Sequence, residues 1–117
     1  MVNYDYMFED KKDAYKEILE EVHNGSAQLV DIREQNEWEQ NRFKCAVHVP
    51  LSGLAKGVGI DILKNIRKEN KKIYLHCRSG NRVRMAEKVL AQYGCTEFSI
   101  IPDSMMKMLE QGFELTQ

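Results

Sequence analysis

The sequence predicts an α/β fold, a small three-layer domain in which a parallel sheet of four or five strands has helices on both faces. Short apolar runs, such as residues 27–32 and 73–75, alternate along the chain with segments whose apolar residues recur at helical spacing. Residues 27–32 have too little polar alternation for a strand with one face in water, so helices should cover both sides. The 117 residues have the length of one domain, and we expect residues 1–117 to form it.

Composition and charge exclude several classes of protein. The formal net charge is −1, which gives no general attraction to nucleic acid or to a membrane surface. No apolar run approaches the roughly 20 residues of a membrane span, and the acidic residues 1–10 lack the basic and apolar parts of a signal peptide. Three cysteines without a CxxC pair argue against a disulfide framework and against a zinc site. We expect a cytoplasmic monomer that needs no metal and no organic cofactor.

Apolar periodicity and turn residues place the elements along the chain. The expected elements are a helix over residues 10–23, a strand over 27–32, a short helix near Trp38, a strand over 46–50, a helix over about 61–69, a strand from about 72 to Cys77, a helix up to Tyr93, a strand over about 98–101 and a last helix that begins near Met105.

The N-terminal half carries two local expectations. Asp10 should cap the first helix, since a side-chain oxygen at that position accepts a hydrogen bond from the first turn. Residues 1–9 include three aromatic residues and should therefore lie against the body of the domain. Trp38 and Phe43 are five residues apart and should anchor the short second helix to the core.

The C-terminal half carries three more. Glycines make residues 53–59 a flexible connection, and Ile62 should face inward from the helix that follows. Either Asp103 or Ser104 should cap the last helix. Its methionines are expected to be adaptable core residues more than a ligand surface; they are Met105, Met106 and Met108.

The candidate site is the stretch over residues 73–84, which reads IYLHCRSGNRVR. Cys77 ends an apolar strand and precedes a helix, so unpaired N–H groups and the positive end of the helix dipole should converge near its sulfur. Arg78 and Arg82 add positive charge, and Gly80 lets the backbone turn and approach closely. We therefore expect Cys77 to be largely a thiolate at neutral pH and a reactive nucleophile, although a lone cysteine at a strand end is commonly just a small buried hydrophobe.

This loop resembles the active-site loop of the rhodanese family of sulfurtransferases, whose pattern CxxGxR is matched by Cys77, Gly80 and Arg82. Related phosphatases and arsenate reductases use a loop with one more residue before the arginine. The shorter ring of N–H groups here suits a single sulfur atom on the cysteine better than a tetrahedral phosphate.

A second region is similar to the N-terminal signature of the same family. Residues 29–33 read LVDIR and lead through Glu37 and Trp38 to the strand ending at Pro50. The resemblance implies that Asp31 and Arg33 brace the loops around the site; the alternative is an exposed capping pair. The chain departs from the family pattern over residues 41–46 and at residues 103–104, outside the CxxGxR loop.

The function implied by this resemblance is sulfur transfer. Cys77 would take a sulfane sulfur from thiosulfate or a low-molecular-weight persulfide and pass it to a thiol or to cyanide. The persulfide would be held by the loop residues Arg78, Ser79, Gly80, Asn81 and Arg82, with Arg82 and Arg78 steadying the anionic donor. A non-enzymatic module that carries sulfur to a protein acceptor or binds a partner is the alternative, and a Cys-dependent phosphatase or arsenate reductase is a further one.

The remaining thiols and imidazoles have structural interpretations. His76 precedes Cys77 on a strand and so points to the opposite face, which makes a Cys-His pair awkward. His48 and His76 are therefore expected to be packing or hydrogen-bonding residues. Cys45 could be a second thiol for sulfur relay, but for Cys45 and Cys95 a buried apolar role is favoured.

Overall fold

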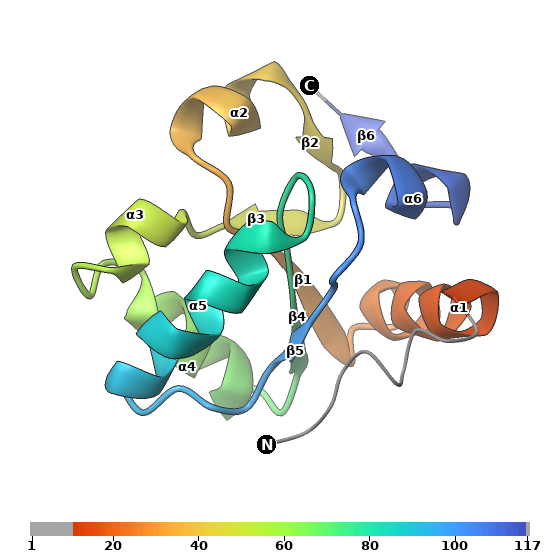
Figure 1. Cartoon of the computed structure of the whole chain (residues 1–117). Helices are drawn as coiled ribbons and strands as arrows, with labels where there is room; N and C mark the ends of the chain where they lie inside the picture. The colour runs from red at the N-terminus through yellow and green to blue at the C-terminus, as the bar shows by residue number, and fades with distance from the viewer. Residues whose placement is uncertain (1–10, 117) are drawn as a thin grey trace.

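The computed structural model describes residues 11–116 (Figure 1). The expected packing of residues 1–9 and the Asp10 cap lie outside these residues. The elements in chain order are α1 (Lys11–His23), β1 (Ala27–Asp31), α2 (Gln35–Gln40), β2 (Arg42–Phe43), β3 (Ala46–His48), α3 (Leu51–Leu54), α4 (Ile60–Lys68), β4 (Lys72–His76), α5 (Asn81–Gln92), β5 (Ser99–Ile100), α6 (Met105–Glu110) and β6 (Leu115–Thr116).

The main sheet is parallel and has the strand order β3-β1-β4-β5. At its centre Leu29 of β1 is aligned with Ala46 of β3 and with Tyr74 of β4. This confirms the predicted parallel α/β sheet, for which four or five strands were expected. A second sheet, formed by the antiparallel pair β2 and β6, was not predicted.

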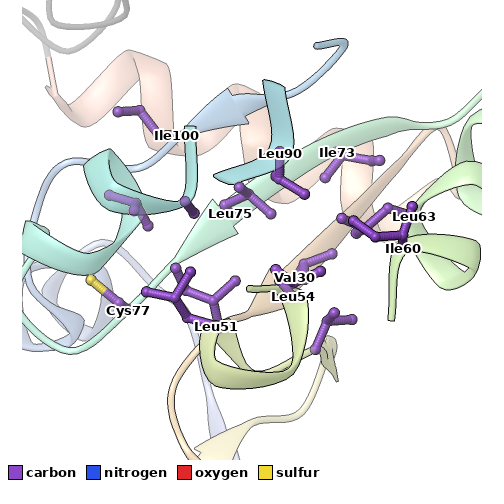
Figure 2. Close-up of a cluster of buried hydrophobic side chains, with 14 of the residues drawn as sticks. Val30, Leu51, Leu54, Ile60, Leu63, Ile73, Leu75, Cys77, Leu90 and Ile100 are labelled. Carbon is purple, nitrogen blue, oxygen red and sulfur yellow. The ribbon is translucent and has the colours of Figure 1, made fainter. Parts of the chain in front are cut away.

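Helices cover both faces of the main sheet, as predicted. Figure 1 shows α1 and α6 on one side, and α3, α4 and α5 on the other. Alternate strand residues point to opposite faces, so Leu29 and Tyr74 join the core under α1 and α6, whereas Val30 and Leu75 join the core under α4 and α5. Figure 2 shows the second of these cores, with Cys77 at one end of it.

Three local predictions are wrong. Ile62 is exposed, because α4 buries Ile60, Leu63 and Ile66, which are spaced three residues apart and leave Ile62 on the outer side. Met106 is also exposed, since only the neighbouring positions Met105 and Met108 of α6 reach the core. The connection over residues 53–59 is not irregular throughout, because its beginning belongs to the short helix α3.

The cap of the last helix agrees with the sequence. Ser104 is the N-cap of α6, and its hydroxyl accepts a hydrogen bond from the backbone N–H of Lys107 at 3.3 Å. Asp103 instead accepts a hydrogen bond from the Tyr15 hydroxyl at 2.9 Å, which ties α1 to the segment before α6. Burial and the Asp103 carboxylate both raise the pKa of Tyr15, so this hydroxyl keeps its proton.

Candidate active site

Cys77 lies between β4 and α5, at the carboxyl edge of the sheet. Its sulfur accepts a hydrogen bond from the backbone N–H of Gly80 at 3.1 Å, and the residue is completely buried. In Figure 2 the sulfur points away from Leu51 and from the rest of the apolar cluster. The sulfur therefore lies beside the N-terminus of a 12-residue helix, whose first N–H groups have no carbonyl partner within the helix.

Gly80 shapes the loop and holds it against a distant segment. Its φ of 93° lies in the left-handed region, and a Cβ atom there would sit 1.9 Å from the carbonyl oxygen of Pro102. Close by, the backbone N–H of Met105 donates to the carbonyl of Arg78 at 3.0 Å. The loop is thus packed tightly against residues 102–105, which follow β5.

The guanidinium of Arg82 is bound to Glu37 of α2. Its two terminal nitrogens donate to the two carboxylate oxygens at 2.5 and 2.9 Å. This hydrogen-bonded pair lowers the pKa of Glu37 from 4.5 to about 2, with the Arg82 hydrogen bond as the largest cause. The charge of Arg82 is therefore matched by Glu37, and the pair fastens the beginning of α5 to α2.

Arg78 and Ser79 form the outer, exposed side of the loop. They line a pocket of about 470 Å³ that lies between α2, the loop and α6. Among the described residues no ion-pair partner of Arg78 is found, so its positive charge is free to meet an anion in this pocket. The other lining residues are Arg33, Glu37, Gln40, Asn41, Ser104, Met105, Met106, Leu109 and Leu115.

Asp31 and Arg33 form a buried pair rather than an exposed one. The carboxylate of Asp31 accepts from Nε and Nη2 of Arg33 at 2.9 to 3.1 Å. The same guanidinium donates to the backbone carbonyl of Asn41 at 2.6 Å. Arg33 therefore joins the end of β1 to Asn41, the residue that ends α2. Both Arg33 and Asn41 line the pocket.

His48 and His76 have packing or hydrogen-bonding roles. His48 stacks on Trp38 with ring centroids 4.7 Å apart, and its Nε2 contacts the carbonyl oxygen of Arg33 at 2.7 Å. His76 is completely buried next to Phe43, and burial lowers its pKa to about 4. Its Nε2 lies 3.7 Å from Asp31 and has no hydrogen-bond partner in the described part of the chain.

Cys45 and Cys95 are free and partly buried, and burial raises the pKa of both thiols. Within residues 11–116 no three metal-binding side chains cluster. The helices in the same range are too short or too polar to cross a membrane.

Two features of the site were missed in the sequence. Glu37 was recognised as part of a motif but not as the ion-pair partner of Arg82. Glu34, Glu37 and Glu39 lie close together, and their spacing does not indicate which of them would pair with an arginine. Pro102 was not connected with Gly80, because contact between two backbones leaves no pattern of side-chain types. The glycine itself was the available signal.

Comparison with known proteins adds to this geometry. A family model described as the Rhodanese-like domain matches residues 14–113. The thiosulfate:glutathione sulfurtransferase of Saccharomyces cerevisiae is 28% identical over 114 residues, which cover 92% of this chain and 78% of that protein. YqhL of Bacillus subtilis, an uncharacterized protein, is 38% identical over 71 residues, which cover 61% of this chain; the chain spans about half of YqhL, or 52%.

A solved structure supports the same fold. The human single-domain sulfurtransferase TSTD1 superimposes with a TM-score of 0.65 at 19% identity, over 82% of this chain and 92% of TSTD1. Such a likeness concerns the fold alone. The family model, however, covers most of the chain, and we conclude that the chain belongs to the rhodanese-like domain family.

Proposed function

We propose that the protein is a sulfurtransferase that moves a sulfane sulfur through a persulfide on Cys77. The observation that carries the proposal is the N–H of Gly80 on the Cys77 sulfur, at the N-terminus of α5. Donors of this kind stabilise a thiolate and then the negative charge of a terminal persulfide sulfur. Membership of the rhodanese-like family supports sulfur transfer in general.

The reaction would be a double displacement. The Cys77 thiolate attacks the outer sulfur of thiosulfate, the S–S bond of the donor breaks, and sulfite leaves with the electron pair. Cys77 then carries a persulfide, cradled by the backbone N–H groups of residues 78–82. An acceptor thiolate, or cyanide, attacks the terminal sulfur and restores the Cys77 thiolate. Thiosulfate with a small thiol is the first pair to test, because the yeast relative is a thiosulfate:glutathione sulfurtransferase.

The two arginines would have different roles. Arg78 is exposed in the pocket without an ion-pair partner among the described residues, and we assign it to the anionic donor. Arg82 was predicted to share this task, but its guanidinium is occupied by Glu37. We therefore assign Arg82 a positioning role, in which it holds the N-terminal turn of α5 under the sulfur.

The complete burial of Cys77 favours a small donor. The sulfur must become accessible before it is loaded, and thiosulfate needs a smaller opening than a folded partner does. We further propose that the protein is a monomer in the cytoplasm, where the reducing environment keeps its cysteines free.

The experiment is to incubate the reduced protein with thiosulfate, measure its intact mass and map the modified peptide. We expect a gain of one sulfur on Cys77, which is lost when cyanide is added. The Cys77→Ser variant should not gain sulfur, whereas the matched control Cys95→Ser should load as the wild type does. Loading of Cys77→Ser, or no loading of Cys77 by thiosulfate or any small persulfide, would reject the proposed transfer.

Two outcomes would favour the alternatives. Cys77 that loads readily but turns over poorly with small acceptors would indicate a carrier that delivers sulfur to a protein. Hydrolysis of p-nitrophenyl phosphate that depends on Cys77 would indicate a phosphatase, although the six-residue loop from Cys77 to Arg82 is short for a phosphate group.

A further inference from the structure

A second cavity lies at the opposite end of the main sheet from Cys77. It has a volume of about 350 Å³, is open to solvent on one side, and is lined by residues of α4, the beginning of β4 and residues 94–98. Figure 2 shows this separation, because Leu63 and Ile73, which line the cavity, lie at one end of the apolar cluster and Cys77 lies at the other. Nothing in the proposed sulfur transfer uses this end of the molecule.

The inner wall of the cavity is apolar. Leu63 and Ile73 are buried members of the core, and Phe98 packs against the same core while remaining partly accessible. An aliphatic and aromatic wall of this kind binds an apolar group by removing it from water.

The rim of the cavity carries unpaired positive charge. Lys64 and Lys68 are four residues apart and therefore lie on the same side of α4. Both are exposed, and neither has an ion-pair partner in the described part of the chain. The third cation, Arg67, is paired with Glu97 at 2.5 Å, so these two residues neutralise each other. The rim therefore has the charge complementary to an anion.

Two further observations place polar groups at the cavity. The Nε atom of Arg67 is buried and lacks a hydrogen-bond partner in residues 11–116, so one donor on a lining residue is left without an acceptor. The Cys95 thiol also lines the cavity. Burial raises the pKa of this thiol, and the positive charge of Lys64 opposes the rise with a smaller effect.

We propose that this cavity binds a small organic carboxylate whose apolar body is no larger than two fused rings. The body packs on Leu63, Ile73 and Phe98, and the carboxylate meets Lys64 and Lys68 at the rim. The volume is at the low end of the range for ligand sites, about 300–1,000 Å³, which limits the size of the ligand.

The test uses naphthalene-2-carboxylate as the probe and backbone amide NMR shifts of the full chain as the readout. We expect saturable shifts at residues 63–68, 73 and 94–98, and none at residues 78–82. The neutral probe naphthalene-2-carboxamide should bind at least tenfold more weakly. Equal binding of the two probes, or shifts that do not saturate or that spread over the surface, would overturn the proposal.

Charge variants give an independent test. Replacing both rim lysines, in Lys64→Gln/Lys68→Gln, should weaken binding of the carboxylate at least fivefold, whereas the matched control Lys56→Gln, an exposed lysine outside the cavity, should leave it unchanged. Unchanged affinity in the double variant would contradict the proposed role of the rim.

The cysteines supply an internal control. Bound naphthalene-2-carboxylate should slow the alkylation of Cys95 by N-ethylmaleimide at least threefold and leave the rate at Cys45, which does not line the cavity, unchanged. Equal protection of both thiols, or protection of neither, would show that the probe does not occupy this cavity.

Discussion

At position 80, backbone conformation and space both require glycine. The left-handed φ costs a residue with a Cβ atom about 1–2 kcal/mol, and the Cβ would also collide with the carbonyl of Pro102. We expect Gly80→Ala to lower the free energy of unfolding by more than about 3 kcal/mol. The loading of Cys77 should also fall at least tenfold, because the donor N–H of residue 80 would move. Chemical denaturation and the thiosulfate mass assay measure the two effects.

Gly25 provides the matched control for this variant. It also has a left-handed φ, of 86°, but a Cβ atom there would meet nothing within 4 Å. Gly25→Ala should therefore cost only the conformational part, about 1–2 kcal/mol, and should leave Cys77 loading intact. Equal destabilisation by the two substitutions would show that the contact with Pro102 is unimportant.

At the scale of elements, the Arg82–Glu37 pair holds α5 to α2. The side chains are 28% and 20% exposed, so solvent weakens the pair only in part. A double-mutant cycle with Arg82→Gln and Glu37→Gln should give a coupling energy of about 1–2 kcal/mol. The single variants should also slow sulfur transfer, whereas removing the exposed pair Lys44–Glu114 should change neither stability nor transfer appreciably. A coupling energy near zero would contradict the proposed positioning role of Arg82.

The pH dependence of this pair has a definite sign. The pKa of Glu37 is lowered from 4.5 to about 2 in the folded chain, so the folded state binds its proton less readily than the unfolded state. The stabilisation is complete above pH 4.5 and is lost as the pH falls from there toward 2. The coupling energy should therefore be equal at pH 7 and pH 5.5, and smaller at pH 3.

For the whole molecule, His76 should make stability fall on mild acidification. Its pKa is lowered from 6.5 to about 4 by burial, so the unfolded chain binds this proton more readily than the folded chain. The contribution is complete above pH 6.5 and is lost as the pH falls toward 4. Urea denaturation across this range should show the loss in the wild type and a flatter profile in His76→Gln. The exposed His23 is the control, and His23→Gln should keep the wild-type profile.

The sequence predicted the features of the molecule that local patterns encode. Residues 27–32 lacked the alternation of a half-exposed strand, and β1 is indeed covered on both faces. The position of Cys77 between β4 and α5 followed in the same way from an apolar run that ends in a glycine-containing loop. That Cys77 is reactive remains a prediction.

Contacts between distant segments could not be predicted in this way. The strands β2 and β6 have two residues each and pair residues 42–43 with 115–116, which is too little chain for a periodic signal. Ile62 and Met106 show a second limit, because apolar composition does not fix which side of a short helix faces the core. The partner of Arg82 depends on how α2 packs against α5, and that packing follows from the whole fold.

The outer strands of the main sheet are very short. β3 has three residues and β5 has two, whereas β1 and β4 at the centre have five each. A strand from another molecule could therefore form only a few backbone hydrogen bonds at either edge. The short edges therefore limit edge-to-edge association between molecules and the aggregation that follows from it. This matters at high concentration and during folding in a crowded solution.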